Sequence, residues 1–178
     1  MAEHPVSLTS VYEGWEGYNS SIVQAINPLG ADQLAFRAAE GLRSVGEIAA
    51  HISVGRVAWF ERMGVERAHG LANAMTPDIS VSINRDASSL SMRLEASWSM
   101  IMETLRAWDV SALTRTYPQE FQGQTYAVSY QWTIWRVMAH DIHHGGELAL
   151  LLGMQGIPVS ELGDLGGHIT MPPLADGT

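Results

Sequence analysis

Hydrophobic residues recur at helical spacing, three or four positions apart, in four long segments of the chain. The first runs from about Leu8 to Ile26, the second from Ser44 to Gly64, the third from Ala87 to Trp108 and the fourth from Ser129 to Leu152. Helices with one apolar face bury that face against one another. Because little strand pattern separates them, the chain is predicted to be all-α, built as a four-helix bundle.

Local signals mark the start of the second segment and the place of the fourth. Ser44 and Glu47 have the spacing of a capping box, in which each side chain satisfies a free backbone N–H of the first turn. The fourth segment is the most apolar of the chain and is hydrophobic on nearly all sides. We therefore expect it to occupy the centre of the bundle.

Three connecting segments lack the long helical pattern. Residues 31–43 are expected to form a turn or a brief extended piece. Residues 68–86, which contain glycine, proline and mixed polar positions, are expected to form a long loop. Residues 109–129 alternate polar and apolar positions around a glycine, which predicts a loop with a small hairpin.

Length and composition are typical of one globular domain. A chain of 178 residues with 46% hydrophobic and 16% charged residues can bury a sizeable core and is not disordered as a whole. We expect a single domain over residues 1–178, with the bundle over about 8–157 and an irregular tail, rich in glycine and proline, over 158–178. No apolar stretch approaches the roughly 18–20 residues that span a bilayer, and the N-terminus lacks the features of a signal peptide. The expected location is the cytoplasm.

Charge and cysteine content narrow the chemistry. The net charge is −9, with 19 acidic residues against 10 basic ones, and the arginines are scattered along the chain. A nucleic-acid-binding protein normally carries a basic patch, so neither nucleic acid nor an anionic membrane is an expected partner. The chain has no cysteine, which excludes disulfides, thiolate ligands and a cysteine nucleophile. A bound metal ion would need nitrogen or oxygen ligands.

Three histidines have the spacing and surroundings of metal ligands. His140 and His144 are four residues apart, so on a helix their side chains lie on the same face. His143 should point about 100° away from that face. His51 interrupts an apolar helical face, where an imidazole needs a partner for its ring nitrogens. A lone buried histidine is more often hydrogen-bonded to a neighbour, but the three together favour a divalent metal site of His51, His140 and His144.

A second interpretation of the same motif is a metal-dependent hydrolase. His140 to His144 also fits H-D-x-x-H, the H-E-x-x-H pattern of metalloproteases with aspartate in place of glutamate. Asp141 would then be the general base, and Glu161 or Asp164 would supply a third ligand downstream. The shorter aspartate reaches a water less well, and the chain has no strand-rich part to align a peptide. This alternative is the weaker one.

The histidines and their neighbours resemble the DinB/YfiT-like superfamily of metal-dependent enzymes. The resemblance covers about residues 8–157 and is strongest over 132–156. It is carried by three motifs, which are Ser44-x-x-Glu47-x-x-x-His51 followed by Trp59-Phe60, Trp135-x-x-x-x-His140-Asp-Ile-His-His144-Gly-Gly-Glu147-Leu, and Leu152-Gly-Met-Gln-Gly156.

The resemblance implies a four-helix bundle with up-down-down-up topology, often dimeric, so a homodimer is expected. It also implies a metal triad of one histidine on the second helix and an H-x-x-x-H pair on the fourth, which correspond to His51, His140 and His144. Relatives use zinc or nickel, and several act as thiol S-transferases or isomerases that depend on bacillithiol or mycothiol.

Three protein ligands leave a coordination position open, as in catalytic metal sites. Such a site can acidify a water or hold a low-molecular-weight thiol as its thiolate. The hypothesis is metal-assisted thiol transfer to a small electrophilic substrate. Glu47 and Asp141 are candidates for orienting the ligand histidines, and Arg136 could hold an anionic group. The alternative is a non-catalytic, metal-binding helical-bundle dimer.

Overall fold

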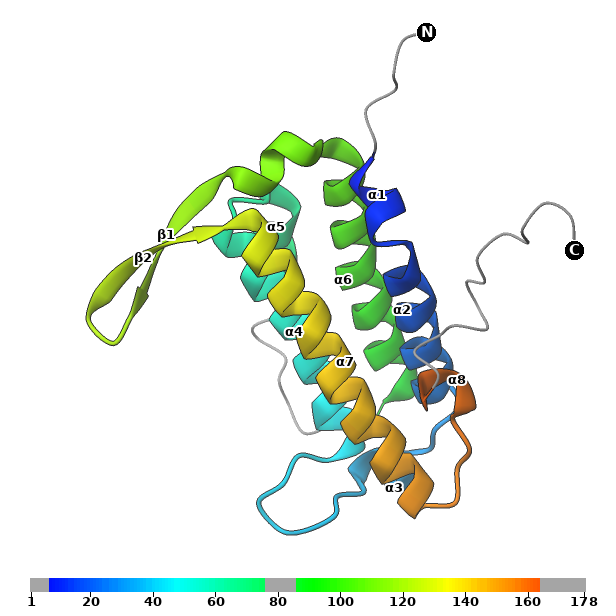
Figure 1. Ribbon diagram of the computed structural model, residues 1–178. Helices are drawn as coiled ribbons and strands as arrows, with labels where there is room; N and C mark the ends of the chain where they lie inside the picture. Colours follow the sequence, from blue (N-terminus) through cyan, green and yellow to red (C-terminus); the bar gives the residue numbers. More distant parts are fainter. Residues whose placement is uncertain (1–6, 76–85, 164–178) are drawn as a thin grey trace, which may run out of the picture.

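Four long helices lie side by side and form most of the computed structural model, which describes residues 7–75 and 86–163. They are α2 (Glu13–Ile26), α4 (Val45–Arg62), α6 (Ala87–Ala107) and α7 (Tyr130–Met154). Helix α4 packs against both α6 and α7, and α2 packs against α6 and more lightly against α7 (Figure 1). The predicted all-α class is confirmed as a mostly helical fold with one small sheet.

Side-chain caps begin three of these helices. At the start of α4, Ser44 Oγ accepts a hydrogen bond from the Glu47 backbone N–H at 3.2 Å, and Glu47 Oε2 accepts one from the Ser44 N–H at 2.7 Å. The predicted capping box is therefore present. Asp86 and Ser129 cap α6 and α7 in the simpler way, each accepting one backbone N–H of the first turn.

Short helices occupy segments for which the sequence predicts none. They are α3 (Ala31–Ala35), α5 (Glu66–Met75), the 3-10 helix η3 (Val110–Thr114) and α8 (Ser160–Gly163). The short helix α1 (Leu8–Val11) lies within the segment from Leu8 to Ile26 that was predicted to be helical, and it precedes α2 there. The expectation of a long loop over 68–86 is wrong for the part that α5 occupies, and residues 76–85 lie outside the described residues. Helix α5 forms because its alanine-rich face buries Ala68 and Met75, which outweighs the helix cost of Gly70.

The tail and the 31–43 segment also differ from their predicted irregular forms. Helix α3 buries Leu34, and α8 buries Leu162 against α2 and α7. One buried leucine in each case anchors a helix too short to be stable alone. Residues 164–178 lie outside the described part of the chain.

A hairpin projects from the top of the bundle. Strands β1 (Thr116–Phe121) and β2 (Gln124–Ser129) pair antiparallel, in a register that runs from Thr116↔Ser129 to Phe121↔Gln124. Gln122 and Gly123 both have positive φ, 50° and 76°, as a two-residue type I′ turn requires. The predicted hairpin is confirmed, and it extends away from the helices (Figure 1).

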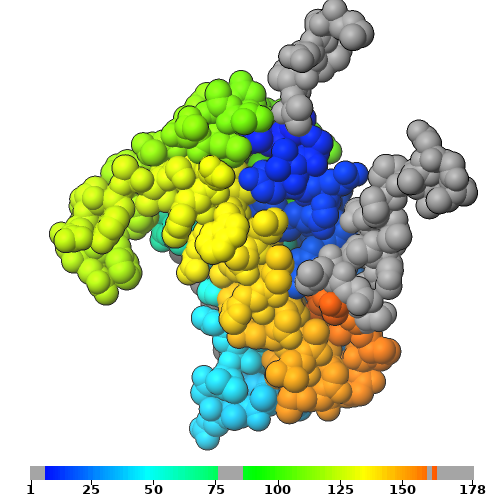
Figure 2. Space-filling view, viewed as in Figure 1, coloured from blue at the N-terminus to red at the C-terminus, as the bar shows by residue number. Residues whose placement is uncertain are grey.

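Helix α7 is only partly buried, contrary to the expectation that it occupies the centre of the bundle. Its inner face contributes Ile134, Val137, Leu148 and Leu152 to the core, but a run of large apolar side chains faces outward. These are Trp132, Trp135, Ile142, Leu150 and Met154, each between 39% and 66% exposed. The space-filling view shows α7, yellow to orange, as part of the outer surface (Figure 2). Within residues 7–75 and 86–163, every helix is too short or too polar to cross a bilayer.

Candidate metal centre

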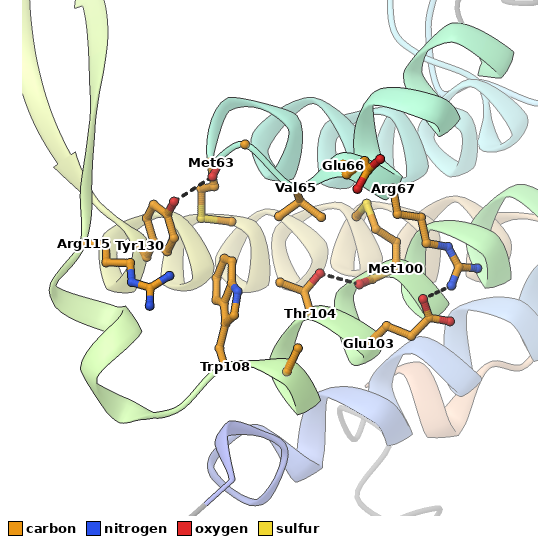
Figure 3. Close-up of a pocket in the computed structure, with 12 residues that line it drawn as sticks. Met63, Val65, Glu66, Arg67, Met100, Glu103, Thr104, Trp108, Arg115 and Tyr130 are labelled. Carbon is orange, nitrogen blue, oxygen red and sulfur yellow. Dashed lines mark hydrogen bonds and ion pairs between the residues drawn. The ribbon is translucent and has the colours of Figure 1, made fainter.

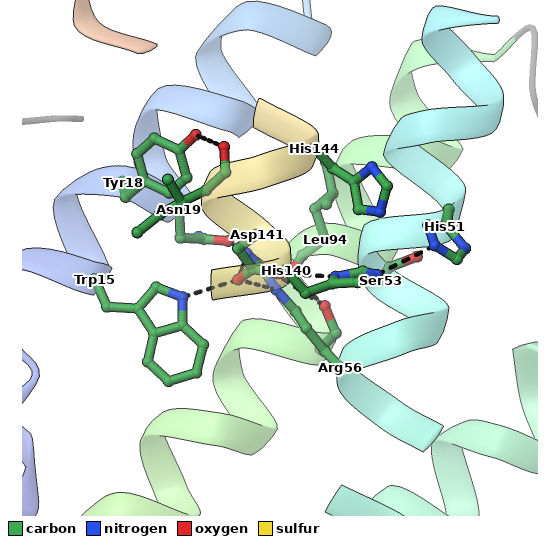
Figure 4. Close-up of polar contacts among 12 residues, drawn as sticks. Trp15, Tyr18, Asn19, His51, Ser53, Arg56, Leu94, His140, Asp141 and His144 are labelled. Atoms are coloured by element: carbon green, nitrogen blue, oxygen red, sulfur yellow. Dashed lines mark hydrogen bonds and ion pairs between the residues drawn. The ribbon is translucent and has the colours of Figure 1, made fainter. Parts of the chain in front are cut away.

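The three histidines predicted as metal ligands lie together between α4 and α7. His51 comes from α4, and His140 and His144 come from successive turns of α7 (Figure 4). The Nε2 atoms of His51 and His140 are 3.1 Å apart. The ring centroid of His144 lies 4.7 Å from that of His51 and 4.4 Å from that of His140. One ring nitrogen of each histidine lies within 4.8 Å of the others, so the three converge on one point.

The spacing of these nitrogens fits a divalent ion. Two nitrogens bound about 2.0–2.1 Å from one ion at a near-tetrahedral angle would be about 3.3–3.4 Å apart. The observed 3.1 Å between His51 and His140 is close to that separation. His140 Nδ1, on the other side of its ring, is buried and makes no hydrogen bond, so no neighbour fixes the proton of this ring at that nitrogen.

Burial favours the neutral, metal-binding form of two of the ligand histidines, His51 and His144. The pKa of His51 is lowered from 6.5 to about 4, first by burial and then by the positive charges of Arg43, His140 and His144. Burial also lowers the pKa of His144, although a hydrogen bond with Glu147 opposes that effect. Both rings therefore present lone pairs rather than positive charges at neutral pH.

Glu147 orients the third imidazole. Its Oε2 lies 2.7 Å from His144 Nδ1, so a proton on Nδ1 is donated to the carboxylate and Nε2 keeps its lone pair for the ligand centre. Burial raises the pKa of Glu147. The hydrogen bond from His144 and the positive charges of His143 and Arg43 together lower this pKa by more than burial raises it, so the net shift is downward. Glu147 was not among the predicted site residues. Its position one turn after His144 was the available signal.

Two glycines allow the helices to approach closely enough for this arrangement. A Cβ at Gly55 of α4 would lie 2.7 Å from His140 Cε1, closer than real side chains allow. A Cβ at Gly145 would overlap the hydroxyl of Tyr18, which packs on α7 beside His144 and donates a hydrogen bond to the Ile142 carbonyl. The absence of a side chain at both positions therefore gives the histidine rings and their neighbours their space.

The model of the DinB family matches residues 4–163, a span that contains α4, α7 and all three histidines. The chain belongs to the DinB family. Comparisons with curated proteins and with solved structures give no match. The resemblance inferred from the histidine motif is confirmed. The family is typically metal-binding, and the described part of this member contains a histidine group that could hold an ion.

A buried ion pair joins the two ligand-bearing helices of this DinB-family protein. Asp141 Oδ2 accepts hydrogen bonds from Arg56 Nε at 2.9 Å and from Trp15 Nε1 at 2.8 Å, and Arg56 Nη2 lies 2.9 Å from the same oxygen (Figure 4). Neither side chain of the pair has exposed surface. Arg56 Nη1 donates to the Asn19 side chain and the Leu94 carbonyl. Arg56 was not among the predicted site residues, because nothing near it in the sequence distinguishes it from other helical arginines until α7 packs beside it.

Asp141, predicted to orient a ligand histidine, is held mainly by this core pair. Its second oxygen, Oδ1, is buried without a hydrogen bond and lies 3.8 Å from Nδ1 of His140. A carboxylate with no exposed surface is poorly placed to act as the general base that the H-D-x-x-H interpretation requires. Of the other residues in that interpretation, the Glu161 side chain and Asp164 lie outside the described residues.

The remaining predicted site residues lie at the edges of the cluster. Glu47 faces back to the cap of α4, where it also pairs with Arg37 at 3.3 Å. Arg136 is exposed on α7, one turn before His140, and lines a cavity beside the hairpin. His143 is exposed, as helical geometry predicts, and its Nε2 lies 3.4 Å from Glu147.

His143, His144 and Glu147 form a second group that could hold an ion. This group shares His144 with the triad and includes Glu147, which now contacts His144 Nδ1. Two of its three members face solvent to a large extent, with side-chain exposures of 68% for His143 and 41% for Glu147. The triad is the better enclosed of the two groups.

A separate cavity of about 380 Å³ lies at the other end of α4, away from the histidines. Its walls include Met63, Val65, Thr104, Trp108 and Tyr130 (Figure 3). Arg67, which also lines this cavity, is paired with Glu103 (Figure 3). This cavity contains none of the residues predicted to carry chemistry.

Proposed function

We propose that this DinB-family protein is a metal-dependent enzyme in which His51, His140 and His144 hold a zinc or nickel ion. The observation that carries the proposal is the convergence of three imidazoles from two helices, with two Nε2 atoms 3.1 Å apart. The lowered pKa values of His51 and His144 support it, because metal ligands must be deprotonated. Three ligands also leave a position for a reactant.

The proposed reaction is transfer of a low-molecular-weight thiol to a small electrophile. A divalent ion at such a site supplies Lewis acidity, which favours the thiolate form of a bound thiol at neutral pH. The thiolate sulfur forms a bond to the electrophilic carbon, the leaving group departs with its electron pair, and the thiol proton passes to solvent. The chain has no cysteine, so the sulfur must come from a small molecule. Bacillithiol and mycothiol, the thiols implied by the family, are the first candidates, and an isomerase that uses the same thiols is a variant of this proposal.

The protein's own residues hold the ligands in place. Glu147 keeps a proton on Nδ1 of His144, and the Arg56–Asp141 pair fixes α7 against α4. The close packing at Gly55 places the His140 ring beside α4. These contacts set the positions of the ligand nitrogens before an ion arrives, which lowers the cost of binding it.

The fold and the assembly belong to the same proposal. In Figure 1 helices α2 and α7 run downward while α4 and α6 run upward, which supports the up-down-down-up topology. The outward apolar residues of α7, among them Trp135, Ile142 and Leu150, support a homodimer that covers them. We also propose that the enzyme is cytoplasmic and acts on a small molecule, with neither nucleic acid nor a membrane as a partner. Sedimentation of the purified protein tests the dimer.

Metal content tests the ligand set. Protein purified without a metal-affinity column should contain a zinc or nickel ion, measured by plasma mass spectrometry. His51→Ala and His140→Ala should each lose it. His143→Ala is the matched control, because His143 neighbours the triad and belongs only to the competing group. Equal metal in wild type and His140→Ala, or loss of metal in His143→Ala alone, would contradict the triad.

Activity is tested with monochlorobimane and a panel of low-molecular-weight thiols. Metal-loaded wild type should form the fluorescent conjugate faster than the uncatalysed reaction with at least one thiol, and His140→Ala should not. Conjugation with no thiol would favour the non-catalytic metal-binding dimer. Hydrolysis of an activated ester that needs the metal but no thiol would instead favour the hydrolase.

A further inference from the structure

A cavity of about 730 Å³ lies between α4, α7 and the hairpin, within the usual size of small-molecule sites. Trp59 and Arg62 of α4 form one wall, Trp132 and Arg136 of α7 form another, and the hairpin closes a third side with residues that include Phe121 and Tyr126. Figure 2 shows the hairpin standing away from the helices, so the cavity opens to solvent.

The walls of this cavity are aromatic and exposed. The Trp59 and Trp132 rings meet edge to face, with centroids 5.8 Å apart and planes at 66°. Trp132, Phe121 and Tyr126 are 45%, 61% and 46% exposed. Large aromatic surfaces gathered in one concave place favour a flat apolar ligand, which would cover them and gain ring–ring contacts.

The cavity also contains two arginines, Arg62 and Arg136, that have no carboxylate partner in the described part of the chain. The Arg62 guanidinium lies 4.4 Å from the centroid of the Trp59 ring, which limits its freedom. Among residues 7–75 and 86–163, neither Arg62 nor Arg136 forms a salt bridge or a hydrogen bond. By contrast, Arg56 and Arg67 are both paired with carboxylates. In a chain of net charge −9, two unpaired guanidinium groups at one cavity indicate an anionic ligand, and a planar carboxylate matches their geometry.

The cavity adjoins the histidine cluster. Arg136 precedes His140 by one helical turn on α7, and Trp59 follows Gly55, against which His140 packs, by one turn on α4. One turn is about 5–6 Å along a helix. Trp59 and Arg136 are thus the cavity residues nearest to the histidine cluster along the two helices, and a carboxylate bound at Arg136 would be the end of the ligand that faces His140.

We propose that this cavity binds a small planar aromatic carboxylate, with the carboxylate on Arg62 and Arg136 and the ring against Trp59 and Trp132. Binding of such an anion does not depend on a metal ion. Its further role, as the place that holds the electrophilic substrate beside the histidines, rests on the proposed function. The substrate class is then an aromatic acid that carries an electrophilic carbon.

Binding is tested on the full-length, metal-free protein with 2-naphthoate and its neutral isostere 2-naphthamide. Isothermal titration calorimetry should detect naphthoate binding that is about ten- to hundredfold tighter than naphthamide binding, as expected when hydrogen bonds to a charged group are lost. Arg136→Gln and Arg62→Gln should each weaken naphthoate binding by about tenfold or more. Trp132→Leu should weaken both ligands. All three positions are exposed or partly exposed, and circular dichroism checks that each variant is folded.

Arg67→Gln is the matched control, because Arg67 is an exposed arginine at the other cavity. It should leave naphthoate binding unchanged. Equal affinity for naphthoate and naphthamide, an Arg67→Gln effect as large as that of Arg136→Gln, or no binding at millimolar concentration would each overturn the proposal. A change from dimer to monomer in Trp132→Leu, with no loss of ligand binding, would show that a second copy of the chain covers this surface instead.

The role beside the histidines has its own measurement. In metal-loaded protein, Arg136→Gln should raise KM for an anionic aromatic electrophile with metal content and kcat little changed. Loss of metal in Arg136→Gln would overturn this assignment. Because the binding experiment uses metal-free protein, its result is independent of whether His51, His140 and His144 hold an ion.

Discussion

Replacing Asp141 by asparagine should leave the charge of Arg56 buried without its counter-ion. Both side chains are fully buried. The remaining acceptors of the guanidinium are neutral, and they are the Asn19 side chain, the Leu94 carbonyl and the Ser97 hydroxyl. Removing one partner of a buried pair costs about 3–5 kcal/mol, because the interior neither solvates nor screens the charge that remains. We therefore expect Asp141→Asn to lose roughly that much free energy of unfolding.

A loss of this size is readily measured. In a chain of 178 residues, about 2–4 °C of melting temperature is lost per kcal/mol, so Asp141→Asn should melt roughly 6–20 °C below wild type. The Arg67–Glu103 pair is the matched control, since its side chains are 44% and 53% exposed. Solvent screens an exposed pair, so Glu103→Gln should shift the midpoint much less than Asp141→Asn does.

The assay is thermal unfolding of metal-free protein at pH 7, followed by circular dichroism. A double variant, Arg56→Met with Asp141→Leu, distinguishes the cost of an unpaired buried charge from the cost of lost packing, because it removes both charges and fills a similar volume. It should be more stable than Asp141→Asn. The reasoning is refuted if Asp141→Asn melts no lower than Glu103→Gln, or if the double variant is no more stable than the single one.

Three further predictions concern the histidine cluster. Gly55→Ala should lower metal affinity by about tenfold or more in a competition titration, because its Cβ would displace the His140 ring. Gly146→Ala is the control, because a Cβ there meets open space on α7. It should keep the metal and raise the free energy of unfolding by about 0.5–1 kcal/mol. Glu147→Gln should weaken the same titration by about ten- to hundredfold, because His144 loses a charged partner that fixes its proton, and an unchanged affinity would refute that role. In metal-free protein the free energy of unfolding should be at its full value above about pH 6.5 and fall as the pH drops toward 4. The reason is that His51 has its ordinary pKa of 6.5 in the unfolded chain, whereas its pKa in the folded protein is about 4, so the unfolded chain binds the proton first. Urea unfolding of wild type and His51→Leu across this range tests the assignment, since the dependence should be weaker in the variant.

The sequence predicted least well where small segments depend on distant contacts. Helix α5 was expected to be loop because Gly70 and the following proline outweigh a short alanine-rich pattern when propensity alone is considered. Burial of Ala68 and Met75 against the rest of the protein reverses that balance. The outward apolar face of α7 shows the opposite effect. An apolar composition predicts burial, but no described helix covers that face.

The four long helices, the capping box of α4, the hairpin and the shared face of His140 and His144 were determined by the sequence itself. Each depends on residues within a turn or two of one another, where backbone geometry leaves little choice. The meeting of His51 with His140, 89 positions later, and of Arg56 with Asp141, 85 positions later, was decided only by the tertiary structure. The packing of α4 on α7 sets those distances, and it depends on the absence of a side chain at Gly55 and on a buried charge pair that no local pattern reveals.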